Sequence, residues 1–193
     1  QNGHSNVVKM LIAAGADVNQ ARTDSGTTPL KIATEQGHHQ VVKELIAAGA
    51  DVNQARTDSG TTPLYSAADI GHSGVLKMLI AAGADVNQAR TDNGATPFHA
   101  AAYNGHSKVV KKLIAAGAHV NQARTDNGVT PLYIAAQNGH FKVAKMLIAA
   151  GADVNQARTD SGSTPLYIAA YNGHSQVAKM LIAAGADVNQ AKT

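Results

Sequence analysis

The hydrophobic positions of this chain recur with a period of 34 residues. The segment LIAAGADVNQA begins at Leu11 and returns at Leu45, Leu79, Leu147 and Leu181, and a sixth copy at Leu113 carries His119 in place of Asp. A period of this length is typical of arrays in which each unit buries its apolar face only against its neighbours. The sequence therefore predicts a linear stack of small units.

The repeat divides the chain into five complete units and one partial unit. The complete units cover residues 23–56, 57–90, 91–124, 125–158 and 159–192, and residues 1–22 are the end of another unit. No linker, proline-rich tract or charge block interrupts the units, so we expect residues 1–193 to form a single domain. Because the chain starts inside one unit and stops where another would begin, we expect it to be an excised or partly ordered piece.

Each unit carries signals for two short helices. In the fourth complete unit, Thr130 can cap a first helix whose first turn holds Pro131, and Gly139 can end it in the left-handed conformation. A second helix is expected from about Phe141, with Gly151 ending it in the same way. Leucine, valine and alanine lie at helical spacing on one face of each helix. Two helices that face each other are therefore predicted in every unit.

A polar segment rich in turn residues joins one unit to the next. It reads NQARTDSG over residues 155–162, and the equivalent dipeptides Asn93-Gly94 and Asn127-Gly128 are strong signals for a tight β-hairpin turn. We call this segment, and its equivalents in the other units, the finger. The predicted fold class is an all-α repeat with a β-hairpin finger on each unit.

The composition narrows the class of protein. Hydrophobic residues make up 44% of the chain and aromatic residues only 4%, which indicates a folded interior of small aliphatic side chains. The absence of cysteine excludes disulfides, thiolate metal sites and a cysteine nucleophile. No apolar stretch approaches the length of about 20 residues that spans a bilayer. These features favour a soluble, intracellular protein, and the formal charge of +3 is only a faint hint of an anionic partner.

The order Thr-Pro-Leu, Ala-Ala, Gly-His, Val, Leu-Ile and Gly-Ala-Asp-Val-Asn, which recurs along the chain with few changes, resembles the ankyrin repeat. The resemblance covers nearly the whole chain. It implies a solenoid of helix-loop-helix units with β-hairpin fingers, whose concave face commonly binds another protein. It also implies a protein without catalytic activity, because most members of the family are not enzymes.

Two departures from the family pattern affect this expectation. The unit is one residue longer than the usual one, and the surplus lies in the finger. The histidine of the Thr-Pro-Leu-His motif survives only as His99, and other residues take its place at Lys31, Tyr65, Tyr133 and Tyr167. We expect other groups to replace the hydrogen bonds between units that this histidine makes in the family. The three tyrosines could pack internally with satisfied hydroxyls or contact a partner.

The five complete units differ from one another at a few positions. One group lies at the exposed end of the first helix: Glu35, Asp69, Ile70, Tyr103, Gln137 and Tyr171. A second group follows the finger: Thr27, Val129 and Ser163. In ankyrin proteins these places look toward the partner, so the resemblance makes these nine residues the candidate binding site on the concave face and finger edge. The alternatives are free drift after duplication, in a structural spacer, or a consensus-derived designed scaffold without a natural partner.

Six histidines share one position of the repeat: His4, His38, His72, His106, His140 and His174. Neighbouring helices pack about 8 to 10 Å apart, whereas zinc needs each ligand nitrogen within about 2.1 Å. We therefore expect these histidines to order the loops through hydrogen bonds to neighbouring backbone, and we expect no metal. No phosphate loop, nucleophile elbow or metalloprotease motif is present, so neither catalysis nor a cofactor is expected.

The sequence suggests two other kinds of partner, a nucleic acid and a second copy of the chain. A basic side chain recurs in every finger: Arg22, Arg56, Arg90, Arg124, Arg158 and Lys192. Such a row could bind nucleic acid weakly, but an aspartate follows each arginine by two residues and should neutralise it. Neither end of the chain shows a polar capping unit, so apolar surface at both ends could drive head-to-tail self-association.

Overall fold

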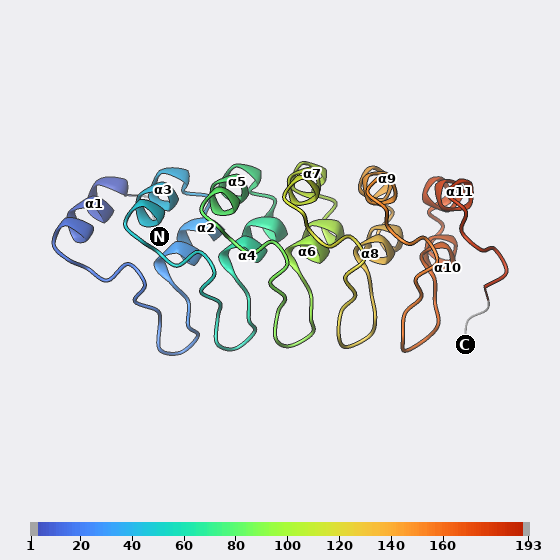
Figure 1. The fold of residues 1–193 in the computed structure, drawn as a ribbon, viewed down its shortest axis with the longest axis horizontal. Helices are drawn as coiled ribbons and strands as arrows, with labels where there is room; N and C mark the ends of the chain where they lie inside the picture. The colour runs from blue at the N-terminus through green and yellow to red at the C-terminus, as the bar shows by residue number, and fades with distance from the viewer. Residues whose placement is uncertain (1–3, 191–193) are drawn as a thin grey trace.

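The computed structural model describes residues 4–190, which form a line of short helices (Figure 1). The first helices of the complete units are α2 (Pro29–Glu35), α4 (Pro63–Ile70), α6 (Pro97–Tyr103), α8 (Pro131–Gln137) and α10 (Pro165–Tyr171). The second helices are α1 (Ser5–Ala13), α3 (His39–Ala47), α5 (Ser73–Ala81), α7 (Ser107–Ala115), α9 (Phe141–Ala149) and α11 (Ser175–Ala183).

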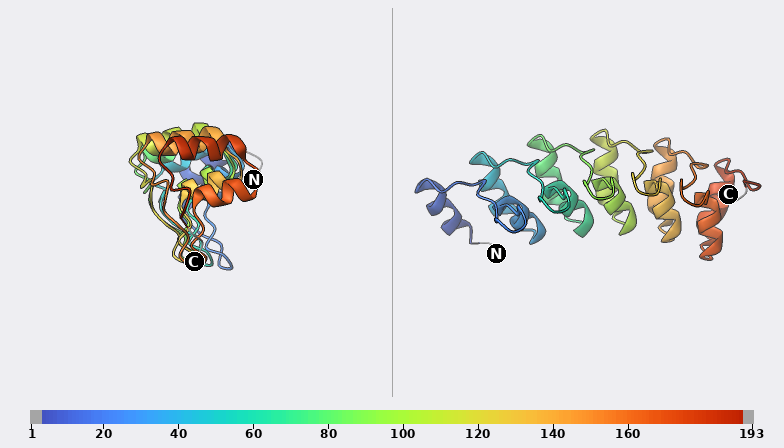
Figure 2. Two further views of the ribbon diagram at one scale, coloured as in Figure 1. Left: turned by 90° about the vertical axis from the view of Figure 1, so that its right-hand side faces the viewer. Right: turned by 90° about the horizontal axis from the view of Figure 1, so that it is seen from below.

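The helices form two layers that run the length of the stack. Each first helix packs on the second helix of its own unit and on the first helices of the adjacent units, and each second helix packs on its neighbours in the second layer. Viewed along the stack, the helices superpose in two layers and the fingers extend together to one side (Figure 2). The prediction of a linear stack is confirmed.

Local sequence explains where the first helices begin and end. The Thr130 hydroxyl accepts a hydrogen bond from the backbone N–H of Tyr133 at 3.2 Å, and Pro131 occupies the first turn. Thr28, Thr62 and Thr164 cap their helices in the same way. Gly139 follows the end of α8 and has a φ of 69°, the left-handed conformation expected of a glycine that terminates a helix.

The core is a continuous apolar layer between the helices. Leu64, Phe98 and Leu132 of the first helices face Leu79, Leu113 and Leu147 of the second helices, and all six side chains are buried. Leu181 of the last unit is buried as well, but its partner Leu166 on α10 is only partly buried, because the last unit has a neighbour on one side only. Val7 and Leu11 of α1 are exposed aliphatic residues, as are Ile182 and Val188 at the other end.

The expected β-hairpin in the fingers is not confirmed, since residues 4–190 contain no β-strand. Each finger is a loop closed at its base, where Arg90 N–H donates to Ala95 O at 2.9 Å and Gly94 N–H donates to Arg90 O at 3.1 Å. A tight Asn-Gly hairpin turn needs positive φ at both residues. Only Gly94 has it, with a φ of 73°, so the turn is wider and no ladder of paired strands follows.

Candidate functional site

The first group of candidate residues lies in a row at the C-terminal ends of the first helices. We call this set the helix-end row: Glu35, Asp69, Ile70, Tyr103, Gln137 and Tyr171. The exposed fractions are 45% for Ile70, 61% for Tyr103 and 76% for Tyr171. Asp69 and Gln137 are exposed as well, and Glu35 is half-buried. The stack therefore brings the six predicted residues onto successive helix ends.

The recurring histidines fix the backbone of this row. The Nε2 atom of His140 lies 2.8 Å from the Tyr103 carbonyl oxygen, and that of His106 lies 3.0 Å from the Asp69 carbonyl oxygen. His72 contacts Glu35 O at 3.2 Å and His174 contacts Gln137 O at 3.0 Å. Since a carbonyl can only accept, the imidazole N–H donates in each pair. The loop-ordering role predicted for the histidines is confirmed at these four positions.

Asparagine amides add a second link between units. Asn138 Nδ2 donates to the Tyr103 carbonyl at 2.9 Å, and Asn172 Nδ2 donates to the Gln137 carbonyl at 2.9 Å. Asn104 Nδ2 instead donates to the Asp69 carboxylate at 2.9 Å. The same repeat position holds Gln36 and Ile70 in the other two complete units, so it varies between units. The three asparagine amides nevertheless bind the preceding unit rather than projecting freely.

Glu35 takes part in a network that the sequence analysis missed. Lys31 is buried and forms an ion pair with the Glu35 carboxylate, and its Nζ also donates to Ser66 Oγ of the next unit at 2.7 Å. Ser66 Oγ in turn donates to Glu35 Oε1 at 3.2 Å. The i,i+4 spacing of Lys31 and Glu35 on one helix was the available sequence signal. Here Lys31, which replaces the motif histidine, restores a hydrogen bond between units.

His99 is buried and makes hydrogen bonds within its own unit and to the next one. Its Nδ1 accepts from the Thr96 backbone N–H at 3.1 Å, and its Nε2 donates to the Val129 carbonyl at 3.0 Å. Burial lowers the pKa of His99 to about 4, because the charged imidazolium would lose its hydration. His99 is therefore a neutral link between two units.

The tyrosines at the same position divide between the two interpretations. Tyr133 is buried, Tyr65 is half-buried, and the guanidinium groups of Arg158 and Arg90 lie 5.7 and 5.4 Å from their ring centroids. These two tyrosines pack internally through cation–π contacts. Tyr167 is exposed and stacks on Tyr171, with ring centroids 6.2 Å apart, so it extends the aromatic surface of the helix-end row.

The second group of candidate residues is buried. The side chains of Thr27, Val129 and Ser163 lie beneath the finger base, each less than a tenth exposed. The Thr27 hydroxyl pairs with Ser25 Oγ at 2.8 Å, and the Ser163 hydroxyl pairs with Ser161 Oγ at 3.1 Å. These residues close the finger, and the helix-end row rather than this group supplies exposed side chains.

The residue type at the repeat position of Thr27, Val129 and Ser163 is matched to the residue two places before it in each unit. Where the later residue has a hydroxyl, as in Thr27, Thr61 and Ser163, the earlier residue is serine and the two hydroxyls pair. Where it has none, as in Ala95 and Val129, the earlier residue is asparagine, whose side chain accepts from the later backbone N–H at 2.9 and 3.0 Å. The structure thus supplies an internal reason for this variation.

The finger charges are paired within each finger. Arg124 Nε donates to Asp126 Oδ1 at 3.1 Å, and its terminal nitrogen contacts the other carboxylate oxygen at 2.5 Å. The same two-pronged pair forms between Arg22 and Asp24, Arg56 and Asp58, Arg90 and Asp92, and Arg158 and Asp160. Hydrogen bonds from Arg22 hold the pKa of Asp24 well below its usual range. Lys192 lies outside the described residues. The basic ladder of the five arginines is therefore offset by carboxylates.

Residues 4–190 contain no group of three or more His, Cys, Asp or Glu side chains that could hold a metal ion. No helix in that range is long and apolar enough to cross a bilayer.

Stacked helix pairs that recur every 34 residues, linked by histidines and loops, define a helical repeat protein. Comparison with family models gives the family: the model for ankyrin repeats (3 copies) matches residues 1–90, 56–124 and 98–192. The chain belongs to the ankyrin-repeat family, whose members are generally protein-interaction modules without enzymatic activity. A search of curated proteins finds no match.

Proposed function

We propose that this chain is a non-catalytic binding module that holds a partner protein against the helix-end row and the finger edge on its concave face. We further infer that its five complete units and one partial unit act as one continuous domain over residues 1–193. In this view the repeated frame supplies stability, and the residues that differ between units supply discrimination among partners.

The observation that carries this proposal is a set of exposed apolar side chains at helix ends, one of which, Tyr103, lies on a backbone that the next unit holds. Ile70, Tyr103 and Tyr171 expose large surfaces at helix ends, and the Tyr103 carbonyl accepts two hydrogen bonds from the following unit. A fixed backbone lowers the entropic cost of ordering a side chain at an interface. Tyrosine in particular is frequent among residues that dominate binding energy.

The remaining residues of the helix-end row have different roles in this proposal. Asp69 and Gln137 orient the partner through a charge and through hydrogen bonds. Glu35 offers less, because its carboxylate already binds Lys31 and Ser66. Thr27, Val129 and Ser163 contribute indirectly by setting the shape of the finger base from beneath.

Affinity capture with matched variants tests this function. The first variant carries Ala at Asp69, Ile70, Tyr103, Gln137 and Tyr171; a second adds Glu35→Ala. The control variant carries Ala at Lys43, Lys77, Lys111 and Lys145, which are exposed at one equivalent position of the second helices. Circular dichroism and thermal unfolding establish that all variants are folded.

We expect proteins captured from lysate by the parent chain to be retained by the lysine variant and lost by the helix-end variants. The same partner, purified, should then bind the parent directly in calorimetry and bind the helix-end variants at least about tenfold more weakly, a loss of about 1.4 kcal/mol. Equal capture by all variants would contradict the proposal and favour a spacer or an unselected scaffold.

A further inference from the structure

The two acidic residues of the helix-end row differ in their partners. Glu35 binds the buried ammonium group of Lys31, which lies four residues earlier on the same helix. In the next unit Tyr65 stands at the position of Lys31, so Asp69 has no cation at the equivalent place. Within residues 4–190, Asp69 forms no ion pair. The negative charge of Asp69 is therefore available to a partner, whereas that of Glu35 is already offset.

The carboxylate of Asp69 is held in place through one of its two oxygens. Asn104 Nδ2 donates to Asp69 Oδ1 at 2.9 Å, whereas Asp69 Oδ2 accepts no hydrogen bond from the described residues. The backbone of Asp69 is fixed as well, because His106 Nε2 donates to its carbonyl oxygen at 3.0 Å. The side chain of Asp69 is exposed. A positioned carboxylate thus keeps one oxygen open to a donor from outside the chain.

Apolar side chains flank this carboxylate. Ile70, the next residue, is 45% exposed, and Tyr103, one unit further on, is 61% exposed. Asn104, which binds Asp69, directly follows Tyr103, so the ring and the carboxylate lie on adjoining helix ends. A carboxylate beside an aromatic ring suits a guanidinium group, which donates two parallel hydrogen bonds to a carboxylate and stacks its flat face on a ring.

The chain itself contains this combination of groups in its interior contacts. Arg90 binds the Asp92 carboxylate with two nitrogens and lies 5.4 Å from the ring centroid of Tyr65. The fourth complete unit contains a second set of the same kind. At Asp69 and Tyr103 a carboxylate and a ring are present without an arginine, because each of the five finger arginines is bound to the aspartate of its own finger.

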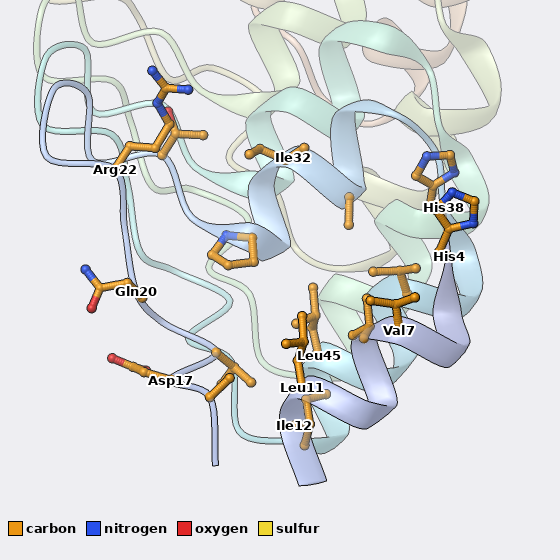
Figure 3. A pocket seen from close by; sticks show the side chains of 17 residues that line it. His4, Val7, Leu11, Ile12, Asp17, Gln20, Arg22, Ile32, His38 and Leu45 are labelled. Atoms are coloured by element: carbon orange, nitrogen blue, oxygen red, sulfur yellow. The ribbon is translucent and has the colours of Figure 1, made fainter. Parts of the chain in front are cut away.

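The exposure of Asp69 and Tyr103 does not depend on the ends of the stack. Helices α4 and α6, which carry them, have complete units on both sides. The cavity of about 510 Å³ beside α1, which Val7, Leu11 and Ile12 line, is of a different kind (Figure 3). In every complete unit the first helix packs on the second helix of that unit, so this cavity is the seat of the partial unit's own first helix and indicates no partner.

We propose that the partner of the helix-end row is an extended segment in which an arginine, flanked by apolar residues, binds Asp69 and stacks on Tyr103. This inference rests on the proposed function and names the chemistry that the row selects. Ile70 packs against the aliphatic stem of the arginine. Neighbouring helices pack about 8 to 10 Å apart and an extended chain rises about 3.3 Å per residue, so one unit matches about three residues of the segment. An apolar residue three positions from the arginine therefore covers the outer part of the Tyr103 ring.

Peptide titration tests this chemistry. The probe is an acetylated and amidated peptide of the sequence Leu-Gly-Gly-Arg-Gly-Gly-Leu, which places a leucine at Tyr103 whichever way the segment runs. The control peptide carries citrulline, which has nearly the shape of arginine without its charge. We expect saturable shifts of the Tyr103 ring and Ile70 methyl signals in NMR spectra with the probe. The control should bind at least about fivefold more weakly, by a ratio that shrinks as salt is added.

Two chain variants locate the charge that the arginine meets. Asp69→Asn removes the carboxylate charge and keeps an oxygen that accepts from Asn104, so it should bind the two peptides equally. Asp85→Asn makes the same change in net charge at an exposed residue of the loop after α5, and should preserve the fivefold ratio. Circular dichroism establishes that both variants are folded. If Asp69→Asn disturbs α4, the comparison of the two peptides on the unaltered chain decides.

Equal binding of the two peptides to the unaltered chain, or no saturable shift with the arginine peptide, would overturn the inference. So would a fivefold ratio that persists in Asp69→Asn, because the arginine would then meet another group. None of these results contradicts the proposed function, which fails on equal capture of partners by all variants. The two conclusions are therefore tested separately.

Discussion

His140 donates a hydrogen bond from Nε2 to the carbonyl oxygen of Tyr103, 2.8 Å away in the preceding unit. The same relationship joins His72 to Glu35, His106 to Asp69 and His174 to Gln137. A residue that is constant in every unit thus fixes the backbone of one that differs between units. The stability of the stack and the geometry of the helix-end row therefore depend on the same hydrogen bond from histidine to the carbonyl of the preceding unit.

Replacing His140 with alanine should therefore loosen the end of α6. The Tyr103 carbonyl keeps its bond from Asn138, so we expect a loss of about 1 kcal/mol in the free energy of unfolding, typical of one hydrogen bond. Urea unfolding measures the loss, and amide hydrogen exchange should be faster in the last turn of α6. His4→Ala, at an exposed histidine of the same repeat position, should change neither quantity. Equal effects of the two substitutions would contradict a specific role for the bond.

The close approach of His174 to Gly139 gives a second prediction. Gly139 and Gly173 occupy the same repeat position, with φ values of 69° and 73°. A Cβ added at Gly139 would lie 2.6 Å from His174 Nδ1, whereas one added at Gly173 would meet nothing within 4 Å. Gly173→Ala should cost about 1 kcal/mol of unfolding free energy for the left-handed backbone alone, and Gly139→Ala should cost at least twice as much.

Denaturant unfolding of both glycine variants separates these two contributions. Gly173 lies in the last complete unit, so hydrogen exchange within each unit should accompany the global measurement. Similar losses at the two sites would show that the imidazole moves aside without cost.

The buried imidazole of His99 predicts a dependence of stability on pH. Its folded pKa of about 4 lies below the ordinary value near 6.5, so the unfolded chain binds more protons between these pH values. The free energy of unfolding should fall as the pH drops through this window, by up to about 3 kcal/mol in total from this group. Protonation would also remove the acceptor that Nδ1 offers to the Thr96 backbone N–H.

Comparison with His99→Tyr isolates the contribution of His99 to the pH dependence of stability. Tyrosine suits this position, since it stands there in three other units. Other histidines titrate in both proteins, so only the difference between their stabilities is informative. Measured from pH 7 to pH 4.5, that difference should shift against the parent chain by about 2 to 3 kcal/mol. A difference that stays constant with pH would exclude His99 as the cause.

The pairing of Lys31 with Glu35 predicts that alanine at Glu35 lowers the free energy of unfolding more than alanine at the exposed Asp69 does. Glu35→Ala removes the carboxylate partner of a buried ammonium group and should cost roughly 2 to 3 kcal/mol, less than for a fully buried pair because Glu35 is partly exposed. Asp69→Ala, at an exposed carboxylate that binds a neutral amide, should cost well under 1 kcal/mol. Thermal and urea unfolding measure both.

A compensating substitution tests the mechanism. In a Lys31→Leu, Glu35→Ala double variant no charge remains buried, so most of the lost stability should return. Failure of the double variant to recover would indicate that Glu35 acts through contacts other than Lys31. The result also determines whether Glu35→Ala is usable in binding experiments.

Much of the fold could be predicted because its determinants are local. Thr130, Pro131 and Gly139 place the limits of α8, and α9 begins at Phe141 as expected. The exposed positions of Ile70, Tyr103 and Tyr171 followed from the repeat comparison. The β-hairpin finger was not confirmed, because the Asn-Gly signal requires a positive φ at asparagine that the wider loop does not impose.

The sequence by itself determined the 34-residue period, the helix pairs and the apolar and turn residues that repeat in every unit. It could do so because capping, glycine conformation and apolar spacing act within a few residues along the chain. Tertiary structure decided which polar groups meet between units: His140 with Tyr103, Lys31 with Ser66, and His99 with Val129. These partners are about 30 to 37 residues apart in sequence. Their contact depends on how one unit stacks on the next, which is set by packing of the whole core rather than by any local propensity.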